Sequence, residues 1–237
     1  KMNKIKFIVF GLLFLFVFTS FAQHLPTIQP EKVGMSSQRL AQIDKVFQEY
    51  IANNMVPGAV ALVMRKGKVV HFQAYGVSNV ETQRKLEKDD LFRIASMTKP
   101  IISVALMTLY EQGKFKLGDD LADYLPEFEN PQVFVSENGK EFTVPAKSPI
   151  TIRNILNHTA GFSYIDDDQV GWMYHDAGVT HGLCRDPLTI EEMVKRMGKL
   201  PLLFHPGEKY KYSLAVDVQG RLIEVLSGMP LDKFLKE

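Results

Sequence analysis

The sequence lacks several features that would point to a particular class of protein. Its single cysteine, Cys184, cannot form an internal disulfide, which excludes a disulfide-stapled scaffold. Its charges nearly cancel, because it has 28 lysines and arginines and 27 aspartates and glutamates. The charge balance therefore does not predict a nucleic-acid partner. It has no internal repeat and no low-complexity segment. What it has is 46% hydrophobic residues in a chain of 237, enough for a packed core in one or two domains.

The longest apolar run lies at the N-terminus. Three lysines within residues 1–6 precede apolar residues 8–18, and residues 19–22 then place small side chains where a signal peptidase reads them. This order predicts a signal peptide cut after Ala22, and hence a secreted or periplasmic protein. A retained membrane anchor is the alternative, but the run is shorter than the ~20 residues that a span needs. We therefore expect no stable membrane span once the signal is removed.

A metal site is a weak alternative in the second half of the chain. Cys184 lies near His175, His181 and the aspartates at 166–168. The spacing matches no known ligand pattern, and runs of aspartate usually lie in solvated loops. We expect neither a metal nor another cofactor.

The first part of the chain predicts a helix followed by a hairpin. Ser36 is a helix cap, and apolar residues recur at helical spacing up to Ile51. Two β-rich runs, residues 59–64 and 69–76, flank a Lys66-Gly67 turn and predict an antiparallel hairpin. Because the first run is continuously apolar, we expect it to be covered on both faces, which requires further strands.

The second part is predicted to be mostly helical. A helix begins close to Ser96 and ends at Gly113, and later helices are capped by Thr151 and by Thr189. Residues 127–149 are predicted to form a surface loop with a small hairpin, and another buried helix is predicted to end at Ser227-Gly228. The predicted order is thus a helix, a hairpin and then a long helical stretch.

Ser96 and Lys99 are the candidates for chemistry. Pro100 is tolerated only in the first turn of a helix, so the helix must begin near Ser96, and residues three apart share one helix face. A serine hydroxyl needs a neighbouring base, and a lysine serves as one when burial or positive surroundings lower its pKa. The pair therefore predicts a serine hydrolase that works through an acyl-enzyme.

Three segments in order carry a family resemblance. Residues 92–100 (FRIASMTKP), 152–161 (IRNILNHTAG) and 206–214 (PGEKYKYSL) together resemble the serine β-lactamase/penicillin-binding superfamily. The resemblance covers the chain from about residue 30 to its end. It points to the branch of class C β-lactamases, family VIII carboxylesterases and D-alanyl-D-alanine carboxypeptidases.

The resemblance implies an α+β, β-lactamase/transpeptidase-like fold with the serine at the junction of two domains. An antiparallel sheet flanked by helices would begin with residues 23–90, and a mostly helical domain would occupy residues 91–220. Residues 221–237 would begin the return to the sheet domain, and the sheet stays incomplete in this chain.

The resemblance also implies roles for individual residues. Ser96 would be the acylated nucleophile, Lys99 its proton partner and Tyr212 the second base, with Tyr210 as the rival for that last role. The backbone N–H of Ser96 would form half of the oxyanion hole. The substrate would be a small ester, a β-lactam or a cell-wall peptide, with Trp172 and Ser213 as candidate binding residues.

Two departures from the family pattern matter. Leu214 stands where the family's Tyr-x-Asn motif has asparagine, which favours esterases or peptidases over lactamases. The third motif, Lys-Thr-Gly or His-x-Gly on a late strand, is absent, so we expect a C-terminally truncated chain that can be inactive even if its full-length parent is an enzyme. The alternative function is a non-catalytic, penicillin-binding-like or cell-wall binding module.

Overall fold

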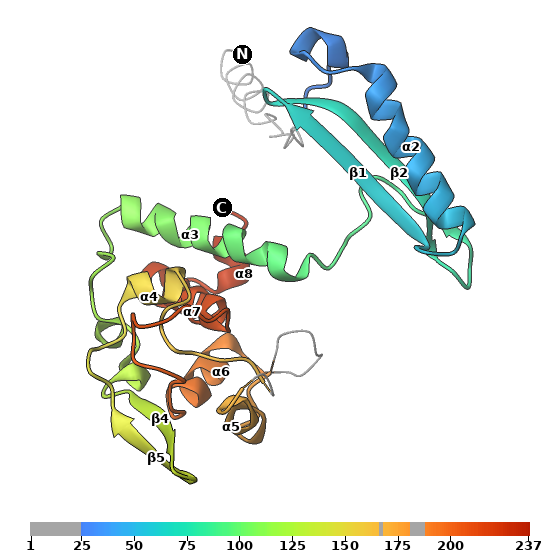
Figure 1. The fold of residues 1–237 in the computed structure, drawn as a ribbon. Coiled ribbons are helices and arrows are strands. Elements are labelled where there is room, and N and C mark those ends of the chain that lie inside the picture. The colour runs from blue at the N-terminus through green and yellow to red at the C-terminus, as the bar shows by residue number, and fades with distance from the viewer. Residues whose placement is uncertain (1–24, 166–167, 181–187) are drawn as a thin grey trace, which may run out of the picture. The chain divides into compact units, whose positions relative to one another are not determined.

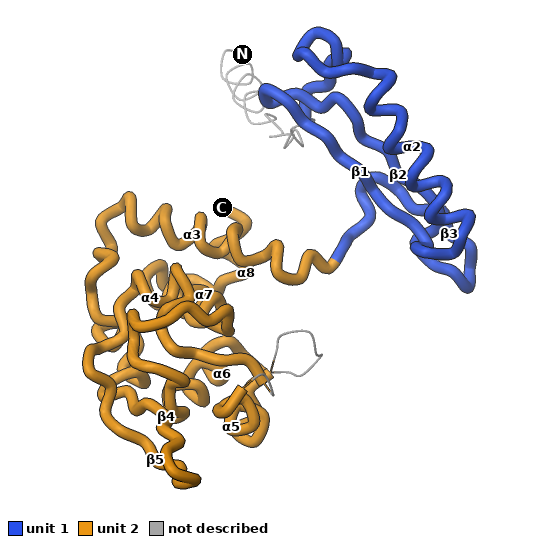
Figure 2. Tube along the Cα trace, in the orientation of Figure 1, with its two compact units in different colours: residues 1–92 blue, residues 93–237 orange. Residues whose placement is uncertain are grey.

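The structure is a computed structural model that describes residues 25–165, 168–180 and 188–237. The chain forms two compact units, residues 1–92 and 93–237 (Figure 2). The predicted signal segment lies outside the described residues. Among the residues that are described, no helix is long and apolar enough to cross a membrane.

The first unit contains one long helix and a small antiparallel sheet (Figure 1). Helix α2 (Ser37–Ala52) is capped by the Ser36 side chain, as predicted. Strands β1 (Gly58–Arg65) and β2 (Lys68–Asn79) form the predicted hairpin, and the short β3 (Arg84–Lys85) pairs with β2 to give the order β1-β2-β3. Helix α2 packs on the sheet through ring stacking of Phe47 on Tyr75 at 5.1 Å.

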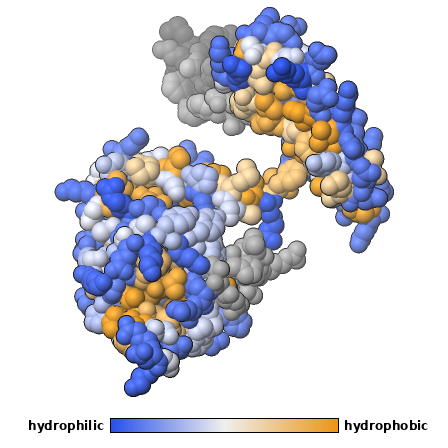
Figure 3. All heavy atoms as spheres, viewed as in Figure 1, coloured by the Kyte–Doolittle hydropathy of each residue, from blue (hydrophilic) through white to orange (hydrophobic). Residues whose placement is uncertain are grey.

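The expectation that β1 is covered on both faces is wrong for the described part of the first unit taken by itself. Leu62 and Met64 on this strand are 46% and 41% exposed. Apolar residues gather along this part of the unit in Figure 3. Within residues 25–92, the Leu62 and Met64 side chains of this apolar run therefore have no cover.

The second unit is mostly helical and is built around α7. Its helices are α3 (Thr98–Glu111), α4 (Ile152–Leu156), α5 (Gly171–Asp176), α6 (Ile190–Met197), α7 (Ala215–Ser227) and α8 (Leu231–Phe234). Helix α7 packs against α3, α4, α6 and α8. Leu106, Ile155, Val194 and Leu222 are fully buried in the core that these helices share. Residues 221–237 thus lie in the same compact unit as the helical segment before them.

Local sequence signals set several element boundaries in this unit. Thr151 caps α4 in a reciprocal capping box with Asn154, and the Thr189 side chain caps α6. The small hairpin forms as β4 (Gln132–Glu137) paired with β5 (Lys140–Pro145). The observed mixture of helices and antiparallel sheets confirms the α+β class.

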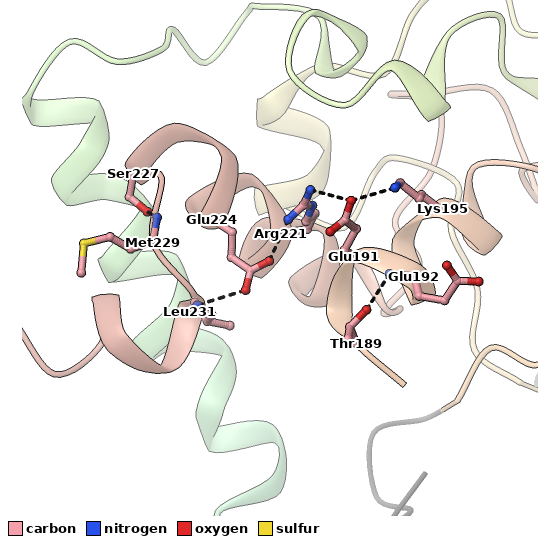
Figure 4. A network of polar contacts seen from close by, with 9 residues as sticks. All are labelled: Thr189, Glu191, Glu192, Lys195, Arg221, Glu224, Ser227, Met229 and Leu231. Atoms are coloured by element: carbon pink, nitrogen blue, oxygen red, sulfur yellow. Dashed lines mark hydrogen bonds and ion pairs between the residues drawn. The ribbon is translucent and has the colours of Figure 1, made fainter. Parts of the chain in front are cut away.

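An ion-pair network joins the last three helices (Figure 4). Arg221 on α7 lies 3.2 Å from Glu191 on α6 and 3.0 Å from Glu224 on its own helix. Glu191 also pairs with Lys195, and Glu224 accepts the N–H of Leu231 at the start of α8. The network therefore fixes α6 and α8 against α7, whose first turn follows the Tyr212 segment.

Gly161 makes a close contact that no other residue could make without strain. Its φ is +89°, and a Cβ there would lie 2.5 Å from the carbonyl oxygen of Phe204. We expect Gly161→Ala to lower the free energy of unfolding by about 1–3 kcal/mol in urea denaturation. Gly113→Ala is the matched control, since its φ is +70° but its Cβ would meet nothing within 4 Å. Equal destabilisation of the two variants would contradict the contact argument.

Candidate active site

Ser96 lies at the entry to α3. It is the middle residue of a 3-10 turn, Ala95–Met97, that leads directly into the helix. Ala95 has a φ of +45°, a left-handed conformation that alanine rarely adopts and that costs conformational energy. Pro100 falls in the first turn of α3, where its missing N–H has no intrahelical partner. The exposed Ser96 hydroxyl is therefore presented by a strained turn at the N-terminus of a helix.

Lys99 and Tyr212 both reach the Ser96 hydroxyl. Lys99 Nζ donates to Ser96 Oγ at 3.3 Å, and the Tyr212 hydroxyl donates to the same oxygen at 2.7 Å. Tyr212 comes from 116 residues further along the chain. The structure thus brings together the three residues that the sequence proposed for catalysis.

The Tyr212 segment is held by the segment that follows α4. Lys211 donates its N–H to the carbonyl of His158 at 2.9 Å, and Ser213 donates its N–H to His158 Nδ1 at 3.3 Å. Leu214 donates its N–H to the carbonyl of Ser163 at 3.4 Å. These bonds run along residues 211–214 and aim the Tyr212 side chain at Ser96.

The Lys99 ammonium lies between two phenols. Its Nζ is 4.5 Å from the ring centre of Tyr212 and 5.8 Å from that of Tyr164. Burial acts to lower the pKa of Lys99, but hydrogen bonds to the two phenols outweigh it, and the pKa is raised. The expectation of a lowered Lys99 pKa is therefore wrong, because the sequence did not reveal the phenols. Lys99 stays positively charged at neutral pH.

The pKa of Tyr212 is shifted in the opposite direction to that of Lys99. Burial acts to raise the pKa of its phenol, but the hydrogen bonds with Lys99 and Ser96 and the positive charge of Lys99 lower it below its usual value. A phenol with a lowered pKa is ionised in a larger fraction of molecules near neutral pH. Of the two groups that reach Ser96 Oγ, Tyr212 is thus the one that loses its proton more readily.

Tyr164 is a residue of the site that the sequence reasoning missed. Its ring lies 5.8 Å from that of Tyr212, and burial raises the pKa of its phenol despite the nearby Lys99 charge. Tyr164 therefore remains a neutral phenol beside the cation. Its position just after the His-Thr-Ala-Gly motif was the one signal in the sequence that could have pointed to it.

His158 packs against Tyr212, and no hydrogen bond found among the described residues joins it to Ser96. Its ring packs 5.0 Å from the Tyr212 ring, and its Nδ1 accepts the N–H of Ser213. Burial and then the positive charge of Lys99 lower the pKa of His158, so the ring is neutral at neutral pH. Ser213 itself is 1% exposed, and its Oγ lies 3.4 Å from the same nitrogen. This geometry favours a supporting role for Ser213 over contact with a substrate.

A buried carboxyl completes the surroundings of Lys99. Asp217 lies in the first turn of α7, and burial raises its pKa to about 6, although the positive charge of Lys99 acts to lower it. Its carboxylate is therefore mostly ionised at neutral pH and adds a negative charge near the Lys99 ammonium. The first turn of α7 thus contributes to the electrostatics of the site.

Known proteins similar to this chain identify its family. The family profile described as Beta-lactamase matches residues 43–237. The chain belongs to the Beta-lactamase family. The superfamily resemblance drawn from the three motifs is thereby confirmed.

Relatives in the Beta-lactamase family include hydrolases of more than one kind. The chain is 33% identical to Esterase EstB of Burkholderia gladioli over 86% of this chain and 50% of the relative. It is 29% identical to a putative D-alanyl-D-alanine carboxypeptidase of Escherichia coli strain K12 over 88% of this chain and 46% of the relative. The chain thus spans about half the length of these relatives.

A solved structure supports the fold of the Beta-lactamase family. EstCE1, described as a hydrolase with promiscuous acyltransferase activity, matches with a TM-score of 0.73 and 33% identity. The match covers 84% of this chain and 50% of that one. The predicted β-lactamase/transpeptidase-like fold is confirmed.

The remaining sequence candidates lie outside the group around Ser96. Trp172 is on α5 and is 50% exposed. Among the described residues, no hydrogen bond or ring contact joins it to Ser96, Lys99 or Tyr212. His175 lies 3.3 Å from Asp176, whereas His181, Cys184 and two of the three aspartates are outside the described residues. The residues that are described include no group of three side chains suited to hold a metal.

Proposed function

We propose that this chain carries the catalytic residues of a serine hydrolase that works through an acyl-enzyme. The observation that carries the proposal is the convergence of Tyr212 Oη, at 2.7 Å, and Lys99 Nζ, at 3.3 Å, on Ser96 Oγ. Such distances allow proton transfer to and from a nucleophilic hydroxyl.

The proposed reaction has two halves. The Tyr212 phenolate takes the proton of Ser96, whose Oγ bonds to the substrate carbonyl carbon while the carbonyl oxygen becomes an oxyanion near the Ser96 N–H. The proton on Tyr212 then passes to the leaving oxygen as its bond to carbon breaks. In the second half, water loses a proton to Tyr212, attacks the acyl carbon and releases the acid, and Ser96 regains its proton. Lys99 stays protonated throughout and stabilises the phenolate.

The proposed substrate class is a carboxylic ester. Two proteins at 33% identity support it, since one is an esterase and the other a hydrolase with acyltransferase activity. Leu214 supports it too, because it stands where lactamases of the family use asparagine. A peptide ending in D-amino acids is the second candidate, which the similarity to a putative D-alanyl-D-alanine carboxypeptidase favours.

The test is covalent labelling of Ser96. We expect a fluorophosphonate probe to label the wild-type protein at Ser96 by peptide mass spectrometry and to leave Ser96→Ala unlabelled. Loss of the nucleophile should also lower p-nitrophenyl acetate hydrolysis by at least about 10³-fold. Folded wild-type protein that binds penicillin or a cell-wall peptide without any label at Ser96 would contradict the proposal and support the non-catalytic alternative.

We also propose that the protein is exported. The charged, apolar and small-residue order of residues 1–22 supports this. Expression in a bacterial host should yield a protein whose mature N-terminus is Gln23. Protein found in the cytoplasm with residues 1–22 retained would contradict export.

A further inference from the structure

Gln219 is a buried polar side chain to which the proposed reaction assigns no part. It lies on α7, is 1% exposed and makes two hydrogen bonds. Ser103 Oγ on α3 donates to its Oε1 at 2.9 Å, and its Nε2 donates to the carbonyl of Ile155 on α4 at 2.8 Å. A carbonyl only accepts, so the amide nitrogen must face Ile155 and the amide oxygen must face Ser103.

Each of these bonds ends on an element that carries part of the site. Ser103 lies four residues after Lys99 on α3 and therefore on the same helix face. Ile155 lies three residues before His158, whose ring packs on Tyr212. The helix that carries Gln219 begins at Ala215, three residues after Tyr212. One amide thus joins the serine helix, the histidine segment and the tyrosine segment.

Hydrogen bonds add a directional restraint to the apolar contacts between these helices. The core around Gln219 is made of fully buried apolar side chains, among them Leu106, Leu222 and Ile223. Hydrophobic burial is non-directional, whereas a hydrogen bond between side chains restrains one particular arrangement of the helices. Hydrogen bonds depend steeply on distance and angle, and misplacement of reacting groups by about 1 Å can cost 10²-fold in rate.

We propose that Gln219 is a positioning residue that fixes α3 and α4 against α7 and thereby sets the distance between Ser96 and Tyr212. The inference rests on the proposed function, because that distance matters only if a proton moves along it. Gln219 touches no reacting atom and acts through the helices that it joins.

The central variant is Gln219→Met, which keeps the volume and length of the side chain but removes both hydrogen bonds. We expect its folded fraction to react with the fluorophosphonate probe about 10- to 100-fold more slowly than wild type. Ser103→Ala removes only one of the two bonds and should give a smaller decrease. The double variant should be no slower than Gln219→Met, since both changes break the same bridge.

A readout that needs no turnover is the ionisation of Tyr212. Its pH titration can be followed by NMR with ¹³Cζ-labelled tyrosine, and its resonance is the one that disappears in Tyr212→Phe. If the bridge sets the approach of Tyr212 to Ser96 and Lys99, the pKa of Tyr212 should move upward in Gln219→Met. Ile223→Val is the matched control, because it also weakens the core of α7 but leaves the bridge intact.

The outcomes separate the two proposals. If Gln219→Met lowers only the thermal midpoint, as Ile223→Val does, and leaves the labelling rate and the Tyr212 titration at wild-type values, the positioning role is wrong. If the wild type is never labelled at Ser96, the proposed function fails, while a shifted Tyr212 titration in Gln219→Met still supports the positioning role.

Discussion

Replacing Tyr212 with phenylalanine should slow acylation of Ser96 by about 10²–10⁴-fold, the range typical for loss of a general base. The change removes the oxygen that lies 2.7 Å from Ser96 Oγ. It keeps the ring that packs on His158 and Tyr164, so the fold should persist. The measurement is the second-order rate of fluorophosphonate labelling, with circular dichroism to verify folding.

Tyr210→Phe is the matched control for this experiment. Tyr210 lies two residues earlier and is 68% exposed. Among the described residues, its ring contact is a T-shaped one with His158, with the ring centres 6.0 Å apart. We expect Tyr210→Phe to be labelled at the wild-type rate. If Tyr210→Phe were slow and Tyr212→Phe normal, the assignment of the phenol would be reversed.

Replacing Lys99 with methionine should slow acylation at pH 7 by about 10- to 1,000-fold, because an opposite charge nearby shifts a pKa by about 1–3 units. Without Lys99, burial still acts to raise the pKa of Tyr212, while the largest lowering contribution, the hydrogen bond with Lys99, is gone together with the positive charge of Lys99. The labelling rate should therefore rise with pH as Tyr212 ionises. This rise should occur at higher pH in Lys99→Met than in wild type. The pH profile of labelling measures this shift.

Lys99→Arg distinguishes a cation from a base at this position. Arginine keeps the positive charge but cannot release a proton at any pH of interest. Because the pKa of Lys99 is raised, we expect Lys99→Arg to keep the pH limb close to wild type and to react faster than Lys99→Met. Equally slow arginine and methionine variants that have both lost the wild-type pH limb would show that Lys99 itself accepts the proton.

Ionisation of Asp217 near pH 6 should give a second inflection, at lower pH, in the pH profile of labelling, and Asp217→Asn should remove it.

The sequence predicted those parts of the site that depend on local geometry. A serine and a lysine three residues apart at a helix start must share a face, and the structure places Lys99 Nζ at 3.3 Å from Ser96 Oγ. Caps such as Thr151 and Thr189 were predictable for the same reason, since a cap and its partner are close in sequence.

The electrostatics could not be predicted in this way. The pKa of Lys99 depends on phenols that reach it from residues 164 and 212, and no local pattern places them there. The burial of Ser213 and the exposure of Leu62 likewise depend on what packs against each residue in three dimensions. Tyr212 was identified only because its motif resembles a known family.

The position of Trp172 has a practical consequence for spectroscopy. It is the sole tryptophan in the chain, and it lies half exposed on α5 in the unit of residues 93–237. Indole emission from this protein therefore reports on that unit and not on the hairpin unit. A fluorescence melt would track the part of the molecule that holds the nucleophile, while far-ultraviolet signals would average over both.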